Sequence, residues 1–275
     1  MRLRVAHKSV YRYDPPASGV IQVLRLTPRN HEGQYIVDWR IDVTPDVRLT
    51  THEDAFGNIS HVFSADGPLD ELHVDVDGQV ETQNNNGVVR GTVERFPPSL
   101  YLRDTTLTQA DDGIRDFTAD ILVSSNGSAL DKLHGLLDRL YEDMGHDEAA
   151  SGEEAGQPTP AVIAAKAFAL KRGTARDLAH VFIGAAHTLG IPARFVGGYF
   201  RKPETKLAQD CGHAWAEAYV PDLGWIAFDP ANGFCPTDAH VRVAVGLDYL
   251  GAAPMRGTRL GVGAETLEVA IKVDQ

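Results

Sequence analysis

The spacing of apolar residues changes along the chain and divides it into two structural classes. In the first hundred residues, short apolar runs over 20–26, 35–43 and 72–80 alternate with polar positions or are closed by turn residues. From residue 128, leucines recur three and four positions apart, from Leu130 to Leu140. Alternation is typical of half-buried strands, and a three-to-four spacing is typical of one face of a helix. The sequence therefore predicts a strand-rich first part and a second part that contains helices.

Turn-forming residues separate the short strands of the first part. Pro, Gly, Asn and Asp gather at residues 14–16, 30–33, 56–58, 66–68 and 77–78. Many short strands with turns at this spacing predict a β-sandwich-like domain. We assign this domain to residues 1–100 and interpret residues 101–127 as a connecting segment.

The second part, residues 128–275, is predicted to be α+β. Helices are expected over 128–144, from Thr159-Pro160 to about residue 170, and over 177–189, with a loop over 145–157. Ser128 is the expected N-cap of the first of these helices. Strands are expected over 193–200, 214–220, 225–228, 241–245 and 266–273. Helices followed by an antiparallel run indicate helices packed on an antiparallel sheet.

Composition narrows the classes of function. The chain has 275 residues and a net charge of −12, which disfavours binding to nucleic acid. No apolar run approaches the roughly 20 residues of a membrane span, and the first residues lack the apolar core of a signal peptide. We therefore expect a cytoplasmic protein with no membrane partner and no cofactor. The two cysteines, Cys211 and Cys235, are too few for a disulfide framework, and the oligomeric state stays open.

A hairpin predicts the pairing of a histidine with a carboxylate. Residues 221–224 form the expected turn, and pairing counted from it brings His213 close to residues 229–232, which include Asp229 and Asn232. A carboxylate fixes the tautomer of a neighbouring imidazole and stabilises its protonated form, as a general base requires. The best position for a matching nucleophile is a helix N-terminus, where free N–H groups favour a thiolate. The helix start at residues 173–177 reads Gly-Thr-Ala-Arg-Asp.

Long motifs in this order resemble the bacterial transglutaminase-like superfamily, which has a papain-like cysteine peptidase fold. The matching segments are RGTARDLAHVFIGAAHTLGIPARFVGGYF (172–200), HAWAEAYVPDLGWIAFDPANG (213–233) and VRVAVGLDYLGAAPMRG (241–257). YRYD (11–14) and DAFGN (54–58) are similar to the β domain that precedes this core in bacterial members. The resemblance implies attack of a cysteine thiolate on a peptide or glutamine carboxamide, followed by hydrolysis or transfer to an amine.

The resemblance also assigns site residues by position. His213 matches the family's catalytic histidine and Asp229 its catalytic aspartate. Ala175 falls where the family has its nucleophilic cysteine, within a motif usually written Gly-Val-Cys-Gln-Asp, whereas Asp177 and His180 keep the surrounding pattern. Alanine has no lone pair and cannot form an acyl-enzyme. Loss of the nucleophile costs on the order of 10⁶-fold in a serine protease, so we expect this chain to be inactive in thiol acyl transfer.

Three hypotheses explain Ala175. In the first, the chain is a natural pseudoenzyme that binds peptide or protein. In the second, it is an active cysteine peptidase, amidase or transglutaminase that carries an engineered Cys→Ala change. In the third, it is an interaction scaffold whose cleft has no role. Thr174 and Arg176 also depart from the usual motif, which favours natural loss. The family resemblance implies companion proteins of the ATP-grasp and α-helical kinds, and in some cases a proteasome-like protease.

The residues around the motifs admit alternatives. Thr174 is a relocated nucleophile or, as we favour, a helix cap. Arg176 binds an anionic group or pairs with a surface acid. His180 neighbours the site. Trp215 is expected in the hairpin core rather than as a substrate platform.

Two further sets of residues are candidates with weaker support. Cys211 and Cys235 are candidates for a thiol pair, for a disulfide, or for a metal site together with His213. A metal would need a further ligand, and His240 is the one close candidate in the sequence. We favour the simpler interpretation that the two cysteines are independent small apolar residues. Asp248 and Tyr249 match a family loop near the cleft, so substrate contact is implied for them by resemblance alone.

Overall fold

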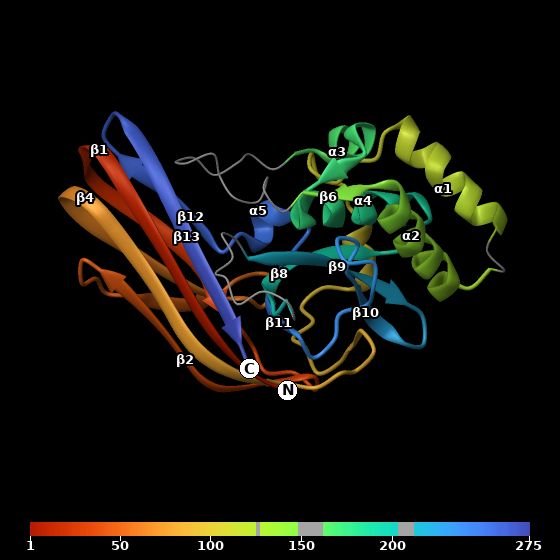
Figure 1. Ribbon diagram of the computed structural model, residues 1–275, viewed down its shortest axis with the longest axis horizontal. Coiled ribbons are helices and arrows are strands. Elements are labelled where there is room, and N and C mark those ends of the chain that lie inside the picture. The colour runs from red at the N-terminus through yellow and green to blue at the C-terminus, as the bar shows by residue number, and fades with distance from the viewer. Residues whose placement is uncertain (125–126, 148–161, 203–211) are drawn as a thin grey trace.

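The computed structural model describes residues 1–124, 127–147, 162–202 and 212–275 (Figure 1). A six-stranded and a five-stranded antiparallel sheet lie side by side, and helices cover the side of the smaller sheet that is remote from the larger one. The expected helix start at Thr159-Pro160, most of the expected loop at 145–157, and Cys211 lie outside the described residues.

Two long strands organise the larger sheet. β1 (Arg2–Thr27) and β4 (Ile59–Thr82) are antiparallel neighbours over nearly their whole lengths. At one end β13 (Ala264–Asp274) and β2 (Gln34–Thr44) flank them, and at the other end β12 (Met255–Leu260) and β3 (Thr50–Glu53) do so. Apolar residues from both ends of the long strands form one cluster. The two long strands therefore contribute to both layers of a sandwich-like domain. The last strands of the chain thus complete its first domain.

Three of the expected turns, at residues 14–16, 66–68 and 77–78, were wrong, because these residues lie inside β1 and β4. Register shifts lie at the first two of these segments, between Arg12 and Ala17 and between Ala17 and Gly19, and such irregularities bend long strands. Two of these segments contain a glycine, which allows another part of the chain to approach closely and does not reverse the chain direction. A Cβ on Gly67 would lie 2.2 Å from the carbonyl oxygen of Ala17, and one on Gly78 would lie 2.2 Å from the Trp39 ring. The turns at 30–33 and 56–58 are confirmed.

The smaller sheet carries the predicted hairpin. Its order is β11 (His240–Gly246), β8 (Ala193–Phe200), β9 (His213–Val220), β10 (Gly224–Phe228) and β5 (Val88–Val89). Helix α4 (Ala175–Thr188) packs against β9 and β8. The small buried side chains of Ala214, Ala216 and Ala218 share one core cluster with the buried residues of α4. Since β-strand side chains alternate between faces, the residues between these alanines lie on the face away from α4.

Further helices surround α4, which is why nearly all of its residues are buried. They are α1 (Asp112–Ser124), α2 (Ala129–Asp143) and α3 (Ala164–Leu170). Sequence analysis did not predict α1, which lies in the expected connecting segment; Asp111 Oδ1 accepts a hydrogen bond from the Ile114 N–H at its start. The remaining elements are a 3-10 helix (Pro98–Leu102), the strands β6 (Gly145–His146) and β7 (Arg172–Gly173), and α5 (Tyr249–Ala252). The pairing of β6 with β7 corrects the expectation of a loop at 145–146.

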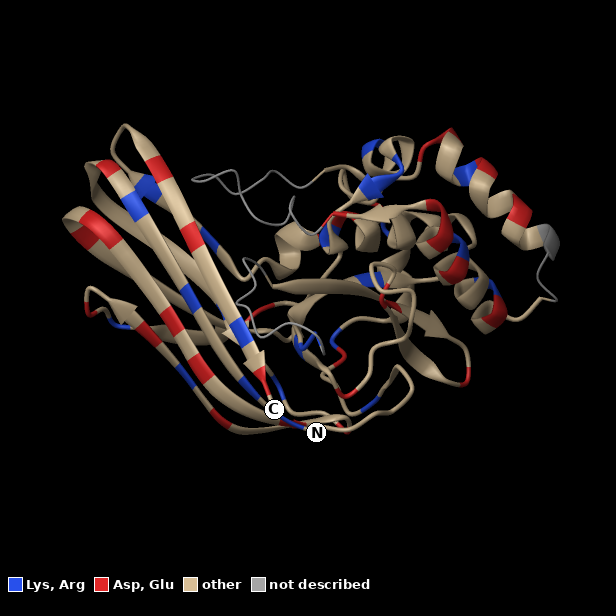
Figure 2. Ribbon diagram, in the orientation of Figure 1, with Lys and Arg blue, Asp and Glu red and all other residues tan. Residues whose placement is uncertain are grey.

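Basic and acidic residues alternate along the strands of the larger sheet, as the blue and red bands on the ribbons show (Figure 2). Arg4 pairs with Asp77, and Arg12 pairs with Glu71 and Glu268. These pairs are about half exposed, so each adds little to stability. Among the described helices, none is both long and apolar enough to cross a membrane.

Two side-chain amides join the larger sheet to β11, an edge strand of the smaller one. Asn58 Oδ1 accepts from the Val245 N–H at 2.8 Å, and its Nδ2 donates to the Val245 carbonyl at 2.8 Å. Gln34 makes the same two contacts with the Arg242 backbone, at 2.8 and 2.9 Å. Each amide therefore satisfies a peptide unit as a neighbouring strand would.

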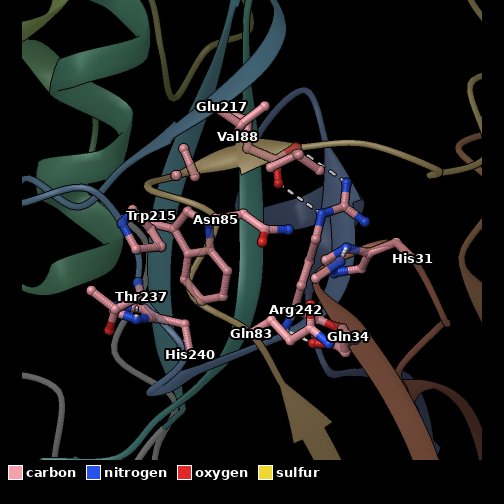
Figure 3. Close-up of a pocket in the computed structure, with 15 residues that line it drawn as sticks. His31, Gln34, Gln83, Asn85, Val88, Trp215, Glu217, Thr237, His240 and Arg242 are labelled. Atoms are coloured by element: carbon pink, nitrogen blue, oxygen red, sulfur yellow. Dashed lines mark hydrogen bonds and ion pairs between the residues drawn. The ribbon is translucent and has the colours of Figure 1, made fainter. Parts of the chain in front are cut away.

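A buried charge network stabilises the face of the smaller sheet that lies away from α4. Glu217 Oε2 accepts from Arg194 Nε and Oε1 accepts from Arg242 Nε, both at 2.7 Å. Figure 3 shows the Glu217–Arg242 pair beside a small cavity that Gln34 of β2 and His31, which precedes β2, also line. Burial alone would raise the pKa of Glu217, but the two arginines lower it to about 2.

Replacing Asn58 with alanine should weaken the junction between the sheets. The Val245 N–H and carbonyl would lose their partners while buried, so we expect the free energy of unfolding to fall by about 1–3 kcal/mol. Urea unfolding measures the change. The exposed Asn84→Ala variant is the control and should change stability by less than about 0.5 kcal/mol. Equal effects of the two substitutions would contradict the role given to Asn58.

Replacing Glu217 with glutamine should change how stability depends on pH. A carboxyl group whose pKa is lower in the folded state stabilises the protein above its unfolded pKa of about 4.3, and that contribution is lost as pH falls towards 2. Glu217→Gln leaves two buried arginines short of an anion and should cost about 3–5 kcal/mol at pH 7. Its stability should also fall less steeply than that of the unaltered protein between pH 4.5 and 2. Parallel curves of unfolding free energy against pH for the two proteins would contradict this role of Glu217. The exposed Glu71→Gln variant serves as the control.

Candidate active site

The start of α4 is a well-formed helix N-terminus with alanine as its first residue. Thr174 is the N-cap, and its Oγ1 accepts from the Asp177 N–H at 3.3 Å. Asp177 Oδ2 in turn accepts from the Thr174 N–H at 3.1 Å and from the Thr174 hydroxyl at 2.7 Å. This capping box confirms the predicted cap. Because the Thr174 hydroxyl is engaged by a carboxylate inside the box, it gains no support as a relocated nucleophile.

The predicted histidine–aspartate pair is present. β9 and β10 pair in the expected register, so His213 at the start of β9 meets Asp229 just after β10. His213 Nε2 lies 2.6 Å from Asp229 Oδ2, and both residues are buried. Ala175 belongs to the same buried cluster as Ala214, the neighbour of His213, and α4 packs on β9. The start of α4 and the strand that carries His213 therefore belong to one packed unit.

Five hydrogen-bond donors surround the Asp229 carboxylate. Oδ1 accepts from the backbone N–H groups of Ala231 and Asn232, at 3.1 and 3.3 Å. Oδ2 accepts from Asn232 Nδ2 at 2.7 Å, from His213 Nε2, and from His240 Nε2 at 3.1 Å. Burial alone would raise the pKa of Asp229, but His213 and His240 hold it well below its usual range. The aspartate is thus a fixed anion, and Asn232 contacts it through both its backbone and its side chain.

His240 belongs to this group, although sequence analysis named it only as an extra metal ligand. Strand register explains its position: His240 pairs with Phe200 of β8, and His213 pairs with Gly198 two residues away. Residues two apart on one strand share a face, so the register places the two histidines on the same side of the sheet. Counting along β8 could have found this contact if the pairing of β11 with β8 had been known.

His213, Asp229 and His240 have the composition of a metal site, and their potential ligand atoms lie within 4.8 Å of one another. The donors around them argue against a metal. His240 Nδ1 accepts from the Thr237 N–H at 3.1 Å, so in the neutral ring Nε2 carries the proton and has no lone pair for a metal. A metal-binding histidine shows the opposite pattern, in which the second nitrogen donates. Burial is the main cause that lowers the pKa of His240, which favours this neutral form.

The candidate metal set of Cys211, His213 and Cys235 gains no support from the described residues. Cys211 lies outside them. The Cys235 sulfur lies 3.7 Å from Nε2 of a different histidine, His134. Burial, and then Asp138, raise the pKa of Cys235 to about 11, so its thiol stays protonated. A protonated thiol is a poor nucleophile and a poor ligand, and Cys235 does not replace the missing cysteine.

The other candidate residues form a second contact between α4 and the segment around α5. The Arg176 guanidinium lies over the Tyr249 ring, 4.6 Å from its centre, and its Nε lies 3.8 Å from Asp177 Oδ1, so it has an acidic partner as well as an aromatic one. His180 Nε2 accepts from the Tyr249 N–H at 3.0 Å. Burial, and then Arg176, lower the pKa of His180 to about 3, so its ring is neutral. Asp248 caps α5 by accepting from the Gly251 N–H.

Trp215 lies in the hairpin core, as predicted. Trp215 is 2% exposed and packs edge-on against His240, with ring centres 5.4 Å apart. Trp225 is also buried, and Arg194 lies 3.8 Å over its ring. Both residues support the hairpin and the charge network beside it.

Comparisons with known proteins agree with this architecture. Residues 3–81 match the model of the bacterial transglutaminase-like N-terminal region, and residues 116–230 match that of the transglutaminase-like superfamily. The uncharacterized protein ML0607 of Mycobacterium leprae is 27% identical over 99% of this chain and 98% of its own length. The uncharacterized protein Rv2569c of Mycobacterium tuberculosis is 24% identical over 99% of this chain and 92% of its own length.

A solved structure shares the fold across the whole chain. It is that of a Cytophaga hutchinsonii protein provisionally described as a cysteine protease, with a TM-score of 0.77 and 19% identity. It covers 100% of this chain and 90% of that one. The α+β architecture and the papain-like core expected from the sequence are thereby confirmed. The chain belongs to the transglutaminase-like superfamily, and its papain-like core is joined to the N-terminal region found in bacterial members.

Proposed function

We propose that this protein is a pseudoenzyme of the transglutaminase-like superfamily that binds a peptide or protein segment at the site of the lost reaction. One observation carries the proposal. The His213–Asp229 pair is fully assembled, while the first residue of α4 is Ala175. A site with its acid–base pair in place but no nucleophile cannot form an acyl-enzyme.

The chemistry of the pair defines what remains. When Nε2–H donates to Asp229, the neutral form of the His213 ring keeps a lone pair on Nδ1. Among the described residues, no hydrogen bond reaches this atom. In the family's reaction it would take the proton of the cysteine thiol. Here, it is a fixed hydrogen-bond acceptor for an N–H or O–H group of a ligand.

The surroundings of Ala175 support natural loss of the cysteine over an engineered substitution. Thr174 and Arg176, which both depart from the family motif, have well-defined contacts in the capping box and on the Tyr249 ring. These contacts fit a helix start that has been maintained with its present sequence. Sequencing codon 175 of the natural gene decides the question, since a cysteine codon would make the protein an active cysteine peptidase, amidase or transglutaminase.

The proposal includes partners and location. Peptides or proteins are the ligands that the family chemistry suggests, and companions of the ATP-grasp and α-helical kinds follow from resemblance alone. A cytoplasmic location is part of the same proposal. The remaining alternative is an interaction scaffold. In it, the His213–Asp229 pair, here called the dyad, persists only because removing one partner of a buried ion pair is costly.

Restoring a cysteine by Ala175→Cys should restore a reactive thiol. The helix N-terminus and His213 would both stabilise a thiolate there, so the pKa of the introduced thiol should fall well below about 8.5. Iodoacetamide labelling from pH 4 to 9, with peptide mapping to separate Cys211 and Cys235, measures it. At pH 6 we expect labelling at least about 10-fold faster than in Ala175→Cys combined with His213→Gln.

A matched control isolates the contribution of the dyad. Ala129 is the first residue of α2 and also follows a serine cap, Ser128, but no histidine–aspartate pair is expected beside it. The Ala129→Cys thiol should therefore gain only the smaller effect of a helix N-terminus. Equal labelling profiles at positions 129 and 175 would show that the site no longer works as a unit, and would favour the scaffold.

A further inference from the structure

Three features outside the family's catalytic positions are notable: the cavity between the sheets, which His240 also lines, the Cys235–His134 contact, and His240 itself. The cavity is lined by the neutralised Glu217–Arg242 pair, which gives no preference for a charged ligand. Cys235 has a protonated thiol. His240 has defined partners on both ring nitrogens and touches the dyad directly.

We infer that His240 is a positioning residue that fixes Asp229, and through it His213, in the orientation needed for the dyad to act as a unit. This inference concerns the site of the proposed function and rests on it. It assigns no metal to the site and no direct contact with a ligand to His240.

Each ring nitrogen of His240 has one hydrogen-bonding role: Nδ1 accepts and Nε2 donates. The Thr237 N–H donates to Nδ1 at 3.1 Å, and the Nε2–H donates to Asp229 Oδ2 at 3.1 Å. The backbone amide at Nδ1 selects the Nε2–H tautomer and opposes protonation, because a protonated Nδ1 would face another donor. His240 is therefore a constant donor to Asp229 and does not compete with His213 as a base.

Aromatic packing holds the His240 ring in place. The residue is 6% exposed. Its ring centre lies 4.4 Å from that of Phe200, 5.4 Å from that of Trp215 and 6.0 Å from that of Phe234. A ring confined on these sides keeps its N–H aimed at one carboxylate oxygen, as a group that orients a catalytic residue must do.

Asp229 Oδ2 is the shared point of the arrangement. The same oxygen accepts from His240 and from His213. If Oδ2 lost the His240 donor, only His213 and Asn232 would hold this oxygen, so the carboxylate would be fixed less firmly against His213 Nε2. We therefore expect the loss of His240 to act on the reactivity that depends on His213, even where the fold is unchanged.

Nitrogen-15 NMR of the histidine side chains in the unaltered protein is the first test. His240 should be an Nε2–H tautomer at pH 7, and His213 Nε2–H should exchange with solvent faster in His240→Phe, which keeps a ring in the aromatic site. An Nδ1–H or a protonated His240 would overturn the inference. Stoichiometric Zn²⁺ binding to the unaltered protein that His240→Phe abolishes would do the same, because it would make His240 a ligand.

The second test uses the restored thiol. In the Ala175→Cys background, His240→Phe should slow iodoacetamide labelling at pH 6 about 10-fold, which is the usual effect of losing one hydrogen bond to a charged group. His240→Gln, which keeps an N–H donor at a similar position, should recover most of the rate. Equal rates in all three proteins, or no recovery with glutamine while the unfolding midpoints agree, would overturn the inference.

The two tests also separate this inference from the proposed function. Slow labelling of Ala175→Cys with His240 intact would count against the retained dyad of the proposed function. The tautomer and exchange measurements on the unaltered chain decide the role of His240 independently of that result.

Discussion

The buried Asp229 carboxylate is the interaction on which the site depends. A negative charge that is fully removed from water is stable only with several donors around it, and here five donors surround it. Those donors come from β9, from the turn after β10 and from the start of β11. The carboxylate therefore ties together three segments that are separate in the sequence. In the proposed function, His213 Nδ1 is the atom that meets a ligand in place of the cysteine that this chain lacks.

The rest of the fold keeps those segments in register. The small side chains of β9 allow α4 to pack closely on one face of the sheet, while the Glu217 network holds β8, β9 and β11 together on the other. Gln34 and Asn58 of the larger sheet satisfy the edge of β11, the strand that begins with His240. The N-terminal domain thus supports the strand that contributes a donor to Asp229, which gives it a structural part in the site.

Local signals in the sequence predicted the site better than they predicted the larger sheet. The turn at 221–224 was enough to bring His213 to Asp229, because a hairpin pairs residues counted from its turn. The cap at Thr174 likewise depends only on residues next to it. Gly67 and Gly78 misled the prediction, because a glycine that admits Ala17 or Trp39 has the same letter as a glycine in a turn. His240 could not be placed beside Asp229, because that contact depends on the pairing of β11 with β8, and their register is not written in either strand alone.

The central claim is that residue 175 alone separates this protein from thiol acyl transfer. The most direct measurement is release of ammonia from glutamine-containing peptides, compared between the unaltered protein and Ala175→Cys. In that reaction the thiolate attacks the carboxamide carbon, the C–N bond breaks and ammonia leaves as a thioester forms. The account predicts no release above background by the unaltered protein, and release by Ala175→Cys that is lost again with His213→Gln. Ammonia release by the unaltered protein that disappears with His213→Gln would contradict the claim, because it would show a working nucleophile other than residue 175.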